Sequence, residues 1–91
     1  MTTLSVRHTV SDFDTWKSAF DSHEPARRSH GATEHRVVLD GNDIEVLIDF
    51  PTVDQARSFT SDPTLKAVME KAGVVSGPQI TFGDTVELVQ Y

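Results

Sequence analysis

Four segments of the chain alternate apolar and polar residues with a period of two, which is typical of β-strands that bury one face. The predicted strands span residues 4–10, about 33–39, 44–50 and 80–88. The sequence DGND at 40–43 lies between the second and third segments and is a strong signal for a tight turn. These two strands should therefore form a hairpin.

A helix is predicted between the first and second strands. At about 100° per residue, one side of it carries Phe13, Trp16, Phe20, His23 and Arg27. Ser11 is the expected N-cap, with Asp14 as its capping-box partner. Pro25 removes a backbone donor, so the helix should kink or restart there, and Gly31 is expected to end it.

A second helical region, predicted in two parts, follows the third strand. Thr52 and Gln55 match a capping box at its start. Asp62 as N-cap and Pro63 at the first helical position predict a restart. The apolar side of the second part consists of Leu65, Val68, Met69 and Ala72. Gly73 is expected to end it in a left-handed conformation.

The predicted order of elements is βαββαβ, with the second helix split in two. Two βαβ-like halves joined by a hairpin favour an α+β, ferredoxin-like fold: a four-stranded antiparallel sheet with the helices on one face. With 91 residues, the chain is expected to form a single domain, 1–91.

Composition narrows the function classes. The chain has no cysteine, which excludes disulfides, a thiolate nucleophile and cysteine-ligated zinc. A net charge of −6 disfavours nucleic acid and anionic membranes as partners. The first residues do not match a signal peptide, and no apolar stretch approaches the roughly 20 residues that span a bilayer. A cytoplasmic protein is the simplest interpretation.

Three polar residues share the parity of the buried strand positions: His8, His35 and Asp84. The first and fourth strands should be antiparallel neighbours, which we expect to bring His8 and Asp84 within a few residues of register. A carboxylate beside an imidazole fixes its tautomer and raises its basicity, as a general base requires. Alternatively, the two groups only satisfy each other. His35 lies on a predicted edge strand and is expected to be a surface histidine.

The helical residues also allow two interpretations. Trp16 and Phe20 are either core residues or the flat wall of a pocket. His23 and Arg27 are either surface cations near a helix end or polar groups of that pocket. His30 is expected to be a solvated residue at the helix end. No histidine pair has the spacing of a helical metal site, although His8, His23 and Asp84 could form a three-ligand set.

The opposite face of the predicted sheet mixes both signs of charge with a few apolar groups. It carries Arg7, Arg36, Glu45, Leu47, Asp49, Thr85, Glu87 and Tyr91. This face is either solvated or a dimer interface with complementary charges.

Three segments carry a resemblance to a known group of proteins. VRHTVSDFDTWKSAFDSH (6–23), followed by Arg27, DPTLKAVMEKAGV (62–74) and GPQITF (77–82) resemble small bacterial proteins of the dimeric α+β barrel superfamily. Within it, the chain is similar to the antibiotic-biosynthesis-monooxygenase-like and cyclase-like group. The resemblance extends from about Leu4 to Leu88.

The resemblance implies a homodimer whose sheets pack across their helix-free faces, with a pocket between sheet and helices in each subunit. It further implies an enzyme that needs no cofactor and acts on a hydrophobic aromatic or polyketide-type compound. His8 would be the general base, oriented by Asp84. Trp16 and Phe20 would form the apolar wall, and His23 and Arg27 would hold a phenolate or enolate oxygen.

Two alternatives remain open at this stage. The first is a non-catalytic dimer that binds a small ligand or has a structural role, with a pocket that is small or filled by side chains. The second is a metal or haem binder that uses His8 or His23.

Overall fold

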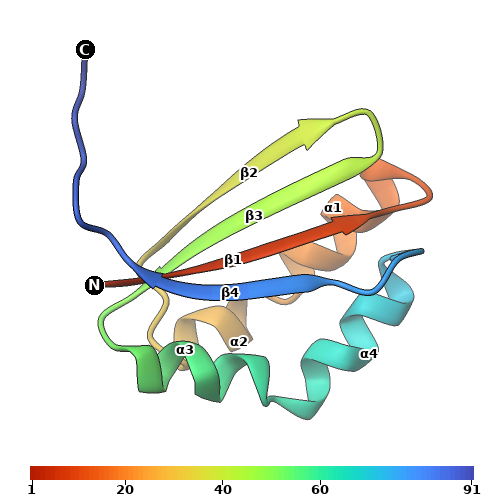
Figure 1. Ribbon diagram of the computed structural model, residues 1–91. Helices are drawn as coiled ribbons and strands as arrows, with labels where there is room; N and C mark the ends of the chain where they lie inside the picture. Colours follow the sequence, from red (N-terminus) through yellow and green to blue (C-terminus); the bar gives the residue numbers. More distant parts are fainter.

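The computed structural model describes all residues from 1 to 91. Its eight elements are β1 (Thr2–Thr9), α1 (Phe13–Ser22), α2 (Glu24–Ser29), β2 (Glu34–Asp40), β3 (Asp43–Phe50), α3 (Val53–Thr60), α4 (Pro63–Lys71) and β4 (Gln79–Asp84). The four strands form one antiparallel sheet in the order β2-β3-β1-β4. All four helices cover the same face of this sheet (Figure 1). The predicted α+β, ferredoxin-like fold is confirmed.

The alternation of β1 decides what lies under the helices. Leu4 and Val6 are buried, and so are the residues that pair with them on β3, Ile48 and Val46. The hydrophobic core contains twelve buried residues, among which Phe50, Leu4, Ile44 and Val10 are the largest that are fully enclosed. His8 has the same parity as Leu4 and Val6, so the strand places its imidazole on the core side.

The helix starts follow local sequence signals, with one correction. Thr52 and Gln55 form the predicted capping box of α3, and Asp62 caps α4 ahead of Pro63. The N-cap of α1, however, is Asp12 and not Ser11, because an Asp12 carboxylate oxygen accepts from the Thr15 N–H at 2.9 Å. The Ser11 N–H instead donates to the Gly73 carbonyl at 3.0 Å, which keeps Ser11 outside the helix.

The first helix breaks at His23, and Pro25 lies in the first turn of α2, as predicted. At the break, the His23 N–H donates to the Phe20 carbonyl at 3.2 Å in place of a regular helical bond. Arg27 Nη1 donates to the same carbonyl at 2.7 Å. The guanidinium carbon also lies 3.7 Å from the centre of the Phe20 ring. Arg27 therefore joins the two halves of the broken helix.

The last strand is shorter than predicted. β4 ends at Asp84, and the side chains of Val86 and Leu88 are exposed. β4 pairs only with β1, and the pair Thr2–Asp84 is the last that β1 can provide. Thr85 still bonds to Met1 and to the Thr3 side chain, and the C-terminal segment then leads away from the sheet (Figure 1). None of the helices has the length and apolar character needed to cross a membrane.

Gly73 should tolerate substitution less well than Gly41. Its φ is +76°, and a Cβ there would lie 2.6 Å from Ser11 Oγ, whereas Gly41 at φ +61° faces open space. Urea unfolding should show that Gly41→Ala costs about 1 kcal/mol from backbone strain alone. Gly73→Ala should cost more, and adding Ser11→Ala should remove the excess. Equal losses in the two single variants would contradict the steric argument.

Candidate functional site

A cavity of about 60 Å³ lies between the sheet and the helices. Most of the side chains that line it are hydrophobic, and they come from β1, β3, β4 and all four helices. The cavity is also lined by five residues that the sequence singled out: His8, Trp16, Phe20, His23 and Arg27. Because all five side chains border the same cavity, it is the candidate site.

His8 is buried without any hydrogen-bond partner. The residue is 7% exposed, and both ring nitrogens are enclosed and unpaired. Its ring lies 5.8 Å from the Trp16 ring, between centres. Burial lowers the pKa of His8, so the imidazole is held in its neutral form at neutral pH. A neutral imidazole has one lone pair that can accept a proton and one N–H that can donate.

The predicted pairing of His8 with Asp84 is wrong. In β1, Thr2 is opposite Asp84, whereas Arg7 is opposite Gln79. His8 and Thr2 are six positions apart on β1, which at about 3.3 Å per residue separates them by roughly 20 Å. Asp84 instead accepts a 3.3 Å hydrogen bond from the Thr2 hydroxyl. No carboxylate orients His8 within the chain.

The register of β4 is set by the residues just before its N-terminal end. Val75 donates its N–H to the Thr9 carbonyl at 2.9 Å, and Val10 forms an isolated bridge with Val74. These bonds bring the start of β4 opposite the end of β1, so the antiparallel strand carries Asp84 away from His8.

Trp16 and Phe20 form an aromatic side of the cavity. Trp16 and Phe20 stack with ring centres 4.8 Å apart and an interplanar angle of 16°. Both are buried, and both belong to the core as well as to the cavity lining. His35 contacts the Phe20 ring edge-on at 5.0 Å, but it is exposed, as predicted, and does not line the cavity.

Arg27 is one of the most deeply buried polar residues, with 3% exposure, and does not occupy a surface position. Burial lowers its pKa, although a guanidinium stays charged in proteins. Nη1 is already engaged by the Phe20 carbonyl. Arg27 therefore brings a positive charge to the cavity wall while it closes the end of α1.

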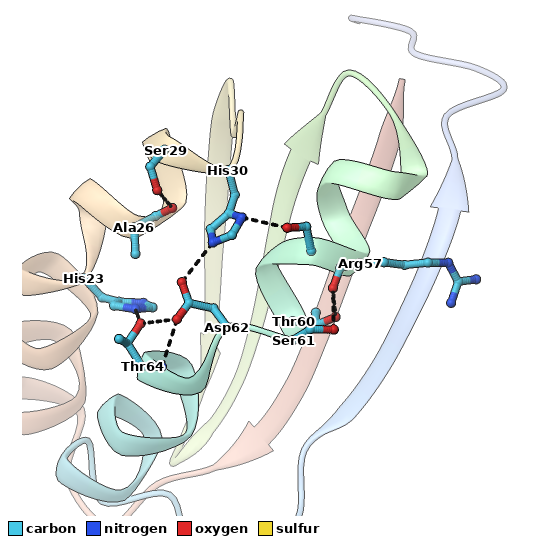
Figure 2. A network of polar contacts seen from close by, with 10 residues as sticks. His23, Ala26, Ser29, His30, Arg57, Thr60, Ser61, Asp62 and Thr64 are labelled. Carbon is cyan, nitrogen blue, oxygen red and sulfur yellow. Dashed lines mark hydrogen bonds and ion pairs between the residues drawn. The ribbon is translucent and has the colours of Figure 1, made fainter.

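His23 belongs to a hydrogen-bonded chain that extends from the cavity to α3 (Figure 2). Its Nε2 lies 3.0 Å from Thr64 Oγ1, and that hydroxyl donates to Asp62 Oδ1 at 2.7 Å. Asp62 Oδ2 is 2.8 Å from His30 Nε2, and His30 Nδ1 is 3.1 Å from Ser58 Oγ. His30 is thus half-buried and paired, which corrects its predicted place as a solvated residue.

The surroundings of these hydrogen-bonded residues oppose protonation of His23 more than they favour it. The hydrogen bond from His30, followed by those from Thr64, lowers the pKa of Asp62 to about 2. Burial lowers the pKa of His23, and so does the nearby charge of Arg27, whereas Asp62 acts in the opposite direction. The site therefore contains a firmly ionised carboxylate and a neutral His23 at neutral pH.

Two of these hydrogen-bonded residues cannot be recognised as site residues from the sequence. Asp62 was identified only as a helix cap, and Thr64 had no signal of its own. No group of three or more histidine, cysteine or carboxylate residues is placed to hold a metal ion. The set of His8, His23 and Asp84 in particular is not brought together, because Asp84 lies at the far end of β1.

Known structures share this architecture, although no protein-family model and no curated protein sequence matches the chain. SnoaB, a cofactor-independent oxygenase from Streptomyces nogalater, superposes with a TM-score of 0.80 at 14% identity, over 99% of this chain and 97% of that one. An antibiotic biosynthesis monooxygenase superposes with a TM-score of 0.73 at 8% identity, over 96% of this chain and all of that one.

A dimeric ferredoxin-like protein from an uncultured marine organism has a TM-score of 0.64 at 12% identity, with both chains fully covered. Identities this low establish similarity of fold and leave the reaction to be argued from the site itself. The chain therefore has the ferredoxin-like fold found in structures of antibiotic biosynthesis monooxygenases.

Proposed function

We propose that the protein is a homodimeric enzyme that needs no cofactor and acts on a hydrophobic aromatic or polyketide-type compound in the cavity between sheet and helices. The observation that supports this most strongly is His8, a buried imidazole with both nitrogens unpartnered at an apolar cavity. An unpaired buried polar group costs about 1–3 kcal/mol of stability. A functional role explains why such a costly group occupies a core position.

In this proposal, His8 accepts a proton from a hydroxyl or an acidic C–H group of the substrate. Its lowered pKa keeps the lone pair free at neutral pH. The stacked rings of Trp16 and Phe20 offer a flat surface to a planar substrate, and the fixed charge of Arg27 favours the negative charge that develops. The chemistry after proton removal is either oxygenation, as in the named oxygenase of similar fold, or ring closure.

The cavity must widen to accept such a compound. Its volume is about 60 Å³, whereas a cavity of roughly 150 Å³ is needed for benzene. The wall that can move is α4, which contributes Leu65, Val68 and Met69 to the lining and contains no fully buried residue. Methionine is unbranched and adapts readily to a new shape. Outward displacement of α4 would therefore open the site from the helical side.

The small volume also favours a second candidate function, a non-catalytic pocket for a small ligand. The two functions differ in what they require of His8. A binding pocket needs only a hydrogen bond from the imidazole, whereas an enzyme needs proton transfer. Turnover of the bound compound, with oxygen uptake as the readout for oxygenation, separates them.

The homodimer is proposed to form across the helix-free face of the sheet. This face has a hollow of about 520 Å³ bordered mainly by polar groups, with Arg7 and Glu45 paired at 3.5 Å. Leu47 and Val38 are the apolar residues that β2 and β3 present there. One solved structure of the same fold is described as dimeric. Pairing two such faces would cover sheet surface that a single small domain leaves in water.

Replacing His8 should separate stability from turnover. His8→Leu removes two unpaired buried nitrogens, so the free energy of unfolding should rise by about 1–3 kcal/mol. Turnover of hydroxylated aromatic compounds should fall by about 10²–10⁴-fold, the usual contribution of a general base. Denaturant unfolding and steady-state kinetics measure the two effects.

His35→Ala is the matched control, because His35 contacts the same Phe20 ring from outside the cavity. It should leave turnover unchanged. Full activity in His8→Leu would refute the assignment of His8 as the base.

The pH dependence of kcat/KM should report the lowered pKa of His8. A base works in its deprotonated form, so activity should persist below the ordinary histidine pKa of about 6.5 and fall only at more acidic pH. The acid limb should be absent from any residual activity of His8→Leu. A midpoint above the ordinary value would contradict the effect of burial.

Light scattering should give the wild-type protein twice the 10.1 kDa mass of one chain. Leu47→Lys places a charge on the helix-free face and should dissociate the dimer. Val53→Lys is the control, because it adds the same charge at an exposed apolar site on α3. It should leave the dimer intact. A wild-type mass of one chain, or dissociation by both variants alike, would refute this interface.

A further inference from the structure

The hydrogen bonds around Thr64 have only one consistent set of donors and acceptors. The Thr64 hydroxyl has a single proton, and it donates that proton to Asp62 Oδ1 at 2.7 Å. It can therefore only accept from His23 Nε2, which lies 3.0 Å away. The proton of a neutral His23 is accordingly on Nε2, and Nδ1 carries the lone pair.

We propose that Asp62, acting through Thr64, is a positioning residue that holds His23 in this tautomer, so that Nδ1 serves the cavity as a hydrogen-bond acceptor. This inference rests on the proposed function only in taking the cavity as the ligand site. Hydrogen bonds from His30 and from the Thr64 N–H keep the Asp62 carboxylate ionised, so Asp62 can only accept. The hydrogen bonds therefore run from His23 to Thr64 to Asp62 and do not reverse.

The arrangement exceeds what a helix cap requires. Asp12 and Thr15 form a similar cap at the start of α1, with the threonine three residues after the aspartate and not two; the carboxylate accepts from the threonine N–H and hydroxyl, both at 2.9 Å. No imidazole is bonded to Thr15. At α4 the cap is extended on both sides, to His23 through the hydroxyl and to His30 through the second carboxylate oxygen. The extension links the cap to the cavity.

The tautomer determines which ligand group His23 can meet. A neutral imidazole whose Nε2–H is engaged presents only a lone pair, so it accepts from a hydroxyl or N–H and repels an anionic oxygen. The charged groups around it are Arg27 from α2, Asp62 from the start of α4, and His30 when protonated. Burial and Arg27 keep His23 neutral. The ligand class is therefore a neutral, hydroxyl-bearing aromatic compound, and His23 is not the oxyanion holder that the sequence suggested.

Long-range ¹H–¹⁵N NMR of the histidine rings tests the tautomer directly, in the intact protein and above the ordinary histidine pKa of about 6.5. Wild-type His23 should show a protonated Nε2 and an unprotonated Nδ1. Thr64→Val should shift His23 to a mixture of tautomers, because the acceptor of the Nε2 proton is lost. Thr64→Ser, which keeps the hydroxyl, should restore the wild-type pattern.

Thr15→Val is the matched control, because it removes the equivalent cap hydroxyl without a histidine behind it. It should leave the His23 signals unchanged, which separates tautomer control from a general loss of helix stability. A wild-type His23 protonated on Nδ1, or a Thr64→Val spectrum identical to wild type, would overturn the inference. Neither result depends on catalytic activity, so failure here and failure of the proposed function are distinguishable.

Phenol and benzoate, which are similar in size, test the ligand class. Phenol is a neutral hydroxyl donor, whereas benzoate is an anion that can only accept hydrogen bonds. Phenol should shift the His23 Nδ1 resonance, and benzoate should not. The phenol response should weaken in Thr64→Val and return in Thr64→Ser. A response to benzoate, or none to phenol up to its solubility limit, would overturn the assignment of His23 as an acceptor for neutral hydroxyl groups.

Discussion

The burial of one face of β1 is the constraint on which the rest of the molecule depends. β1 lies between β3 and β4, so both neighbouring strands take their register from it. Its alternation sends Leu4, Val6 and His8 under the helices, where two of the three stabilise the core and the third leaves polar atoms unsatisfied. The helices must cover this face whatever the function, and His8 lines the cavity that remains between them and the sheet.

Local patterns were enough to predict the elements. Periodicity in the first three strands, the Thr52 capping box, the restart at Asp62–Pro63 and the break at Pro25 depend on neighbours within a few residues, and the structure confirms each. Periodicity alone overextended the last strand, which ends at Asp84. The N-cap of α1 was one residue out because Ser11 is held by the distant Gly73 carbonyl. Capping motifs describe only the helix they start.

Long-range arrangement was harder to predict, for the same reason. Whether Asp84 meets His8 depends on the register of β4, which is set by contacts of Val74 and Val75 that no pattern in β4 reveals. The sequence predicts a solvated His30 because nothing near it along the chain shows that Asp62, 32 residues later, lies beside it. The cavity lining was predicted better, since parity on β1 and spacing on α1 already direct His8, Trp16 and Phe20 inward.

Helix α4, which contains no fully buried residue, couples filling of the cavity to the protonation of His23. This helix forms part of the cavity wall, and its first turn supplies the hydroxyl that binds His23. A displacement of α4 that includes its first turn also lengthens or breaks that bond, whereas a movement of Leu65, Val68 and Met69 alone leaves it in place. In the first case, occupancy of the cavity and the proton distribution on His23 are thermodynamically linked, and each must change the free energy of the other by the same amount.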